Sequence, residues 1–130
     1  AKEIVVSRKK QRILTTDKLV GIISKAVPRK QKGMHVATRT FQALRIAVNS
    51  ELENVEKGIT DAINLLSTGG RVAAISFHSL EDRRVKQIFR EGSSSGLLKI
   101  LTKKPVTPSD EEIRGNPRAR SAKLRVAEKI

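Results

Sequence analysis

The chain has 130 residues, enough for one ordinary domain with a hydrophobic core, and 38% of them are hydrophobic, which is too many for a disordered chain. It contains no cysteine, which excludes disulfides and thiolate metal sites. It contains only two histidines, which are too few for a typical zinc or iron site, so we expect no bound metal. No apolar run is long enough to cross a membrane, so we expect no membrane partner. The absence of cysteine favours the reducing cytoplasm as the location of the protein.

The net charge of +14 is concentrated at the two ends of the chain. Residues 1–33 hold ten basic and two acidic side chains, residues 93–130 hold nine and four, and the middle is nearly balanced. Such a field favours a polyanion, because phosphate contacts supply most of the sequence-independent affinity for nucleic acid. With three Phe and no Tyr or Trp, the chain has few rings on which to stack unpaired bases.

The N-terminal third predicts two helices and a basic loop. Residues 1–12 have a helix-like composition, and a second helix begins at Thr15 or Thr16, either of which can cap it, and ends at Pro28. The loop "RKQKG" follows, and it holds three candidates for phosphate contacts: Arg29, Lys30 and Lys32.

A long amphipathic helix is predicted from Ala37 to about Val55, with Gly58 as a candidate interruption before "ITDAINLL". Its apolar positions recur every three or four residues. A separate polar stripe repeats at the same spacing, and this stripe is either a solvated face or an RNA contact surface. The stripe consists of Arg39, Gln42, Arg45 and Asn49. If it contacts RNA, Arg39 and Arg45 would hold phosphates and the side-chain amides of Gln42 and Asn49 would make polar contacts.

The apolar run "RVAAISF" predicts a strand that is covered on both faces. The helix after it begins at Ser79, with Asp82 completing a capping box, and ends at Gly92. "LLKILTKKP" predicts a strand that stops at Pro105, followed by a Ser-capped helical turn. Alternation through Ala122, Leu124 and Val126 predicts a last strand with one polar face.

This order of elements is typical of an α/β fold with a mostly parallel sheet and an antiparallel last strand. In such sheets ligands bind beyond the carboxyl ends of the strands, where Ser76, His78 and Ser79 lie. Ser79 is interpreted as the helix cap. For His78 two interpretations stay open: a side chain that faces a ligand, or one that hydrogen-bonds nearby backbone.

Three long, colinear stretches carry a resemblance to a known family: "HVATRTFQALRIAVNSELENVEKGI", "GGRVAAISFHSLEDRRVKQIFR" and "KPVTPSDEEIRGNPRARSAKLRVAEKI". From about Thr15 to Ile130 the chain resembles the C-terminal part of the ribosomal RNA small-subunit methyltransferase H (MraW) family. The resemblance implies an S-adenosylmethionine-dependent enzyme that methylates N4 of a cytidine in 16S rRNA, at the decoding centre. The implied partner is 16S rRNA or the small ribosomal subunit. Nothing in the sequence indicates an oligomeric state.

The resemblance also implies a division of the chain. Residues 1–50 would be the end of an inserted helical domain for substrate recognition, and residues 51–130 the C-terminal half of a Rossmann-like catalytic domain. The family's Gly-rich cofactor loop and ribose-binding acid have no counterpart in these 130 residues, so no cofactor-binding residue is assigned here. We therefore expect the isolated chain to be inactive, with S-adenosylmethionine bound mainly by the N-terminal half of the family fold.

Methylation of a cytidine amine requires that the amine and the methyl group be aligned in line. We expect His78 to orient the target amine or to accept a hydrogen bond from it, while Ser76, Ser79 and Asp82 shape the site. The alternative is a basic RNA-binding module without catalytic activity, such as a ribosomal protein. The charge and size fit that alternative equally well, but it explains the strand ending in "SFHS" poorly.

Overall fold

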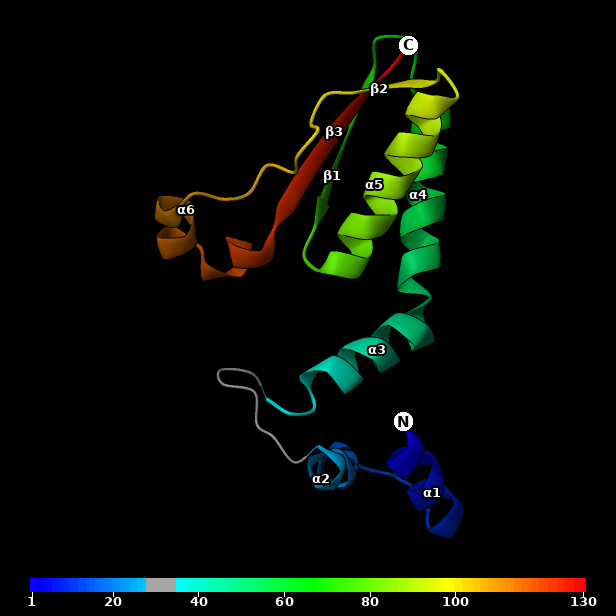
Figure 1. Ribbon diagram of the computed structural model, residues 1–130, viewed down its shortest axis with the longest axis vertical. Helices are drawn as coiled ribbons and strands as arrows, with labels where there is room; N and C mark the ends of the chain where they lie inside the picture. Colours follow the sequence, from blue (N-terminus) through cyan, green and yellow to red (C-terminus); the bar gives the residue numbers. More distant parts are fainter. Residues whose placement is uncertain (28–34) are drawn as a thin grey trace. The chain divides into compact units, whose positions relative to one another are not determined.

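The computed structural model describes residues 1–27 and 35–130 (Figure 1). The chain divides into two compact units, Ala1–Asn49 and Ser50–Ile130. Their interpretation as the end of an insertion and half of a catalytic domain stays a prediction. Three of the predicted RNA-binding residues, Arg29, Lys30 and Lys32, lie outside the described residues.

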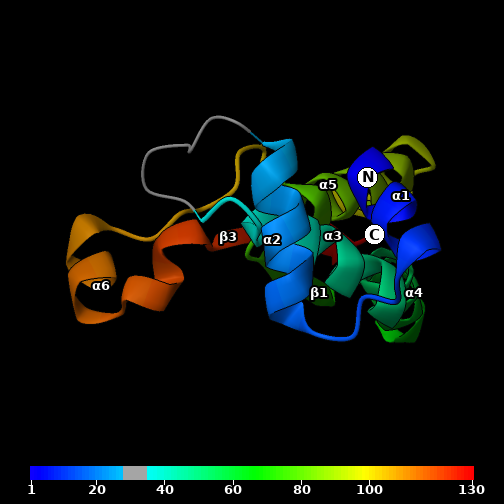
Figure 2. The ribbon, with the colours of Figure 1, turned by 90° about the horizontal axis from the view of Figure 1, so that it is seen from below.

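The first unit consists of helices, as predicted: α1 (Lys2–Lys10), α2 (Thr16–Ala26) and α3 (Thr38–Asn49). The predicted cap of α2 is confirmed, because the Thr15 hydroxyl accepts a hydrogen bond from the Lys18 backbone N–H at 3.3 Å. Helices α1 and α2 contact each other, and Figure 2 shows α2 from the side on which its full length is visible.

The helix predicted from Ala37 to Val55 is interrupted at Ser50 and not at Gly58. Ser50 has φ +48° and ψ +42°, a left-handed conformation that an α-helix cannot continue through. A new helix, α4 (Glu51–Leu65), begins there and passes through Gly58 without a break. Because position 50 is a serine and not a glycine or proline, the sequence contains no signal that α3 ends there.

The second unit combines α4 with a three-stranded sheet and further helices. Its remaining elements are β1 (Arg71–Ser76), α5 (Ser79–Ser94), β2 (Leu98–Ile100), α6 (Asp110–Gly115), the 3-10 helix η1 (Pro117–Ser121) and β3 (Lys123–Lys129).

The strand order is β1-β3-β2, and both pairings are antiparallel. The antiparallel last strand is thus confirmed, but no neighbouring strands of the described residues are parallel, unlike the predicted mostly parallel sheet. Strands β1 and β2 run in the same direction because α5 carries the chain back between them. They are separated by β3, which occupies the position between them (Figure 1).

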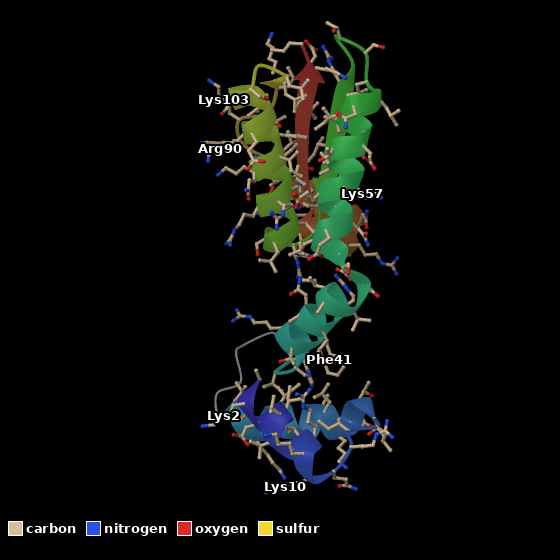
Figure 3. All side chains as sticks on the ribbon, turned by 90° about the vertical axis from the view of Figure 1, so that its right-hand side faces the viewer. Lys2, Lys10, Phe41, Lys57, Arg90 and Lys103 are labelled. Carbon is tan, nitrogen blue, oxygen red and sulfur yellow. The ribbon has the colours of Figure 1, made fainter. Side chains whose placement is uncertain are left out.

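Helices α4 and α5 pack side by side on one face of the sheet (Figures 1 and 3). The buried core between the layers consists of Ile63, Val72, Val85, Phe89, Leu98 and Ala127. Burying side chains of this kind contributes about 1.5–3 kcal/mol for each large one. The two layers therefore supply the stability that holds the end of β1 and the start of α5 in place.

Within the second unit, α4 and α5 cover one face of the sheet and no described element of that unit covers the other face. Burial alternates along β1, and on the open side Ile75 is 63% exposed. Phe77, which follows the strand, is 56% exposed. On β3 the open side carries Leu124 and Val126, paired opposite Ile75 and Ala73.

The face of β3 that points to the helices is its charged one. Arg125 and Ala127 are buried there, whereas the alternation had suggested Leu124 and Val126. Lys129, on the same face, donates from Nζ to the carbonyls of Ile63, Asn64 and Leu66 at 3.0, 3.3 and 2.7 Å. These carbonyls lie at the C-terminal end of α4, where the last carbonyl groups have no N–H donor within the helix. Lys129 therefore caps that helix.

Two predicted boundaries differ from the structure. Strand β2 ends at Ile100 and not near Pro105, because the N–H groups of Leu101 and Thr102 both donate to the Val126 carbonyl and break the regular ladder. Helix α5 continues past Gly92 to Ser94. The glycine is required there for packing: a Cβ at this position would lie 2.6 Å from Cδ1 of Leu98.

Candidate functional site

The connection between β1 and α5, the β1–α5 corner, is closed by a capping box around His78 (residues 77–82 form the corner). The Nδ1 atom of His78 accepts a hydrogen bond from the Glu81 backbone N–H at 3.3 Å. In return, the Glu81 carboxylate accepts from the backbone N–H groups of Phe77 at 2.9 Å and of His78 at 3.3 Å. The box therefore satisfies donors on both sides of the turn.

This arrangement corrects the prediction of a box formed by Ser79 and Asp82. His78 is the N-cap residue, and Ser79 is the first helical residue and is exposed. A histidine can take this role because an unprotonated Nδ1 is a hydrogen-bond acceptor, as the oxygen of the usual Ser or Asp cap is. The spacing His78-x-x-Glu81 is the signal in the sequence that indicates the true box.

The second ring nitrogen of His78 also faces Glu81. Its Nε2 is buried and lies 3.1 Å from the Glu81 Oε1 atom, without the direction that a hydrogen bond requires. Because Nδ1 accepts a hydrogen bond, the proton of the neutral ring is on Nε2. His78 therefore presents an N–H donor at Nε2.

Glu51, His78 and Glu81 bring potential metal-ligand atoms within 4.8 Å of one another in the described part of the chain. The capping box already uses the lone pair of Nδ1 and one carboxylate oxygen of Glu81. Since Nε2 carries the ring proton, it has no lone pair for a cation. The cluster is thus explained by the corner, and we assign no metal to it.

Asp82 is part of a buried ion pair and takes no part in the capping box. Its Oδ1 and Oδ2 atoms accept from Nε and Nη2 of Arg125 at 2.7 and 3.2 Å, and Nζ of Lys123 lies 3.6 Å from Oδ2. The hydrogen bonds from Arg125 hold the pKa of Asp82 below its ordinary value, although burial acts in the opposite direction. The pair joins the first turn of α5 to β3. Ser76, buried at the end of β1, lies opposite Lys123 of β3.

The predicted polar stripe lies within one helix, α3, at spacings that place its four residues on one side. Gln42 is half-buried, and the other three, Arg39, Arg45 and Asn49, are exposed. Their contact with RNA stays a prediction. Sequence inspection missed Arg125 because its partner is 43 residues away in the chain.

Gly69 and Gly70 form the turn that leads from α4 into β1, where Gly69 has φ +82°. The Gly69 N–H donates to the Lys129 carbonyl at 2.7 Å, and the Lys129 N–H donates to the Gly70 carbonyl at 2.8 Å. This turn precedes a strand, so it is not the strand-loop-helix in which a nucleotide cofactor is usually held. The β1–α5 connection contains no glycine at all.

No helix among the described residues is long and apolar enough to cross a membrane. The whole chain, residues 1–130, matches the model of the MraW methylase family.

Three relatives named ribosomal RNA small subunit methyltransferase H illustrate the similarity. The protein of Sulfurihydrogenibium sp. (strain YO3AOP1) is 54% identical over 132 aligned residues, covering all of this chain and 45% of the relative. That of Cyanothece sp. (strain PCC 7425 / ATCC 29141) is 56% identical over 118, covering 91% and 39%. That of Brevibacillus brevis is 47% identical over 147, covering 100% and 47%. The chain thus spans less than half the length of these relatives.

Proposed function

Because the chain belongs to the MraW methylase family, we propose that the whole protein is an S-adenosylmethionine-dependent methyltransferase of small-subunit ribosomal RNA. The observation that carries the proposal is the match over all 130 residues, together with 47–54% identity to relatives whose alignments cover the entire chain. We further propose N4 of a decoding-centre cytidine in 16S rRNA as the target. The family match favours this enzyme over the alternative of a basic RNA-binding module.

The open face of the sheet supports the proposal that this unit belongs to a larger Rossmann-like sheet. An apolar face with Ile75 and Phe77 more than half exposed is unfavourable in water. In the described residues β1 pairs only with β3, so its other edge has unpaired backbone groups. Further strands beside β1 and helices over the open face would satisfy both, and the relatives are more than twice as long as the matched segment.

S-adenosylmethionine would supply the methyl group, but the described residues do not form a site for it. The Gly-Gly turn is hydrogen-bonded to β3, and the acid nearest to the end of β1, Glu81, is used in the capping box. We therefore expect no measurable binding of S-adenosylmethionine by the 130-residue chain, which isothermal titration calorimetry can test. Micromolar affinity would contradict the assignment of the cofactor site to the rest of the protein.

For His78 the geometry supports a positioning role ahead of a proton-accepting one. The hydrogen bond accepted by Nδ1 leaves Nε2 as a donor, and a donor cannot accept a hydrogen bond from the cytidine amine. A direct role with the amine, as the sequence suggested, requires that the ring release the Glu81 N–H. We propose that His78, with Ser76 and Asp82 nearby, fixes the β1–α5 corner on which the target base is presented.

The test is methyl transfer by the whole protein to small ribosomal subunits from cells that lack this modification. Radioactive methyl groups from S-adenosylmethionine should enter the 16S rRNA, and mass spectrometry of its nucleosides should show N4-methylcytidine. Large-subunit rRNA is the matched control and should stay unlabelled. Label in another nucleoside would contradict the cytidine assignment, and no label in small-subunit rRNA would contradict the methyltransferase.

A further inference from the structure

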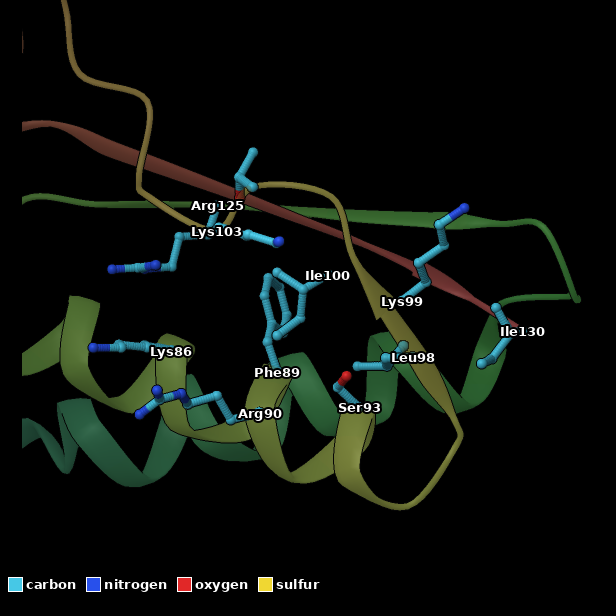
Figure 4. Close-up of a pocket in the computed structure, with 11 residues that line it drawn as sticks. Lys86, Phe89, Arg90, Ser93, Leu98, Lys99, Ile100, Lys103, Arg125 and Ile130 are labelled. Atoms are coloured by element: carbon cyan, nitrogen blue, oxygen red, sulfur yellow. The ribbon is translucent and has the colours of Figure 1, made fainter.

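A pocket of about 710 Å³ lies between α5 and the segment that contains β2, inside the second unit (Figure 4). Its floor is apolar, formed by Phe89, Leu98 and Ile100, and the Phe89 ring faces Ile100 in Figure 4. The volume is within the range of binding sites for molecules of nucleotide size. Neither the predicted RNA-binding residues nor the β1–α5 corner forms part of the lining, so this is a separate surface.

The rim of the pocket is positively charged. Lys86 and Arg90, one helical turn apart on α5, extend in the same direction, and Lys103 lines the pocket from the segment after β2 (Figure 4). All three side chains belong to exposed residues. No acidic side chain is among the lining residues, and no ion pair of the described residues involves these three cations.

Two other cations of the lining do not contribute free charge to the pocket. Arg125 is buried and neutralised by Asp82. Lys99 alternates with Leu98 and Ile100 along β2, so its side chain leaves from the opposite face, and Figure 4 shows its amine pointing away. The free positive charge is therefore that of Lys86, Arg90 and Lys103, the rim cations.

We propose that the rim cations bind the phosphodiester backbone of the RNA substrate, at a second contact surface outside the reacting site. The inference rests on the proposed function for the identity of the polyanion. Three unpaired cations on one rim suit neighbouring phosphates, which a cation holds without reading sequence. The floor does not read bases, because Phe89 is only 2% exposed and offers no ring face for stacking.

The test compares two triple variants of the whole protein in binding a single-stranded RNA of 20 nucleotides, measured by fluorescence anisotropy. The rim variant is Lys86→Gln, Arg90→Gln and Lys103→Gln. The control variant, Lys57→Gln, Arg83→Gln and Arg114→Gln, removes the same charge from the same unit, outside the pocket. Long-range attraction falls equally in both, so only local contacts distinguish them.

For three phosphate contacts on a single strand, the salt slope of log K should become shallower by about 2 in the rim variant. If the rim variant and the wild type bind equally near 1 M salt, this change of slope corresponds to roughly hundredfold weaker binding by the rim variant at 0.1 M salt. The salt slope of the control variant should differ from that of the wild type by less than the value for one phosphate contact, about 0.7. Equal slopes for the two variants, or a wild-type protein that binds no RNA, would overturn the proposal.

Two further measurements complete the test. The first is acylation of lysines in the wild-type protein with and without the RNA, which needs no variant. Bound RNA should protect Lys86 and Lys103 from acylation and should leave Lys57 reactive. Equal acylation of the two rim lysines with and without RNA would refute the contact, even if the rim variant unfolds. Cytidine monophosphate at equal ionic strength should compete weakly; full competition at micromolar concentration would indicate a small-molecule site instead. Methyl transfer is measured separately. If the wild-type protein methylates rRNA but the two variants bind RNA equally, this inference is refuted and the proposed function is not.

Discussion

The buried ion pair between Asp82 and Arg125 should be the most sensitive polar contact of the second unit. Asp82→Ala would leave the guanidinium of Arg125, whose side chain is 8% exposed, without its bidentate partner. Removing one partner of a buried pair costs about 3–5 kcal/mol. Because Asp82 keeps 13% of its side-chain surface exposed and water can reach the site, we expect the lower end, about 3 kcal/mol. In a unit of this size that is a fall in melting temperature of roughly 12–24 °C.

The assay is urea unfolding of the chain followed by far-ultraviolet circular dichroism, with hydrogen exchange of the α5 peptides to assign the loss to this unit. Arg125→Met in addition to Asp82→Ala should recover much of the loss, since a paired apolar replacement leaves no buried charge. Lys123→Ala is the matched control: this lysine is 37% exposed and 3.6 Å from the carboxylate, so its removal should cost less than about 1 kcal/mol. A loss below about 1 kcal/mol for Asp82→Ala would refute the reasoning.

The same pair sets a pH dependence. The pKa of Asp82 is lower in the folded than in the unfolded chain, so the folded state binds the proton less tightly. Its stabilising contribution is complete above the unfolded pKa, near 3.8, and is lost as the pH falls through that value toward the lower, folded pKa. The free energy of unfolding should fall between about pH 5 and pH 2 by more in the wild type than in Asp82→Asn. Parallel curves would show that other carboxylates dominate.

Two further pairs of variants test local features by thermal unfolding. His78→Ala should cost about 1 kcal/mol through loss of the cap, whereas Ser79→Ala should change stability by less than about 0.5 kcal/mol; the reverse order would restore Ser79 as the cap. Gly92→Ala should destabilise by about 1–3 kcal/mol despite its better helix propensity, because the new Cβ would overlap Leu98. Gly58→Ala, where nothing lies within 4 Å, should stabilise by about 0.5–1 kcal/mol, and a destabilised protein would show that the space is filled.

The family, most helices and the strand "RVAAISF" were predictable from the sequence, because each depends on local patterns. The cap at Thr15 has a side-chain type and spacing that favour helix starts in any context. The candidate corner was placed correctly after β1, but its capping residue was not identified. Ser79 and His78 can both accept a hydrogen bond, and only the backbone dihedral angles of the turn decide which of them does.

Contacts between distant segments were decided by the tertiary structure alone. The alternation of β3 fixes two faces without indicating which one meets the helices. The charged face turned inward because Asp82 and the carbonyl end of α4 supply partners for Arg125 and Lys129. The rim of the pocket likewise combines α5 with the segment after β2, whose proximity depends on the position of β3 between β1 and β2. Local sequence sets propensity and periodicity, whereas the pairing of buried charges is set by which elements pack together.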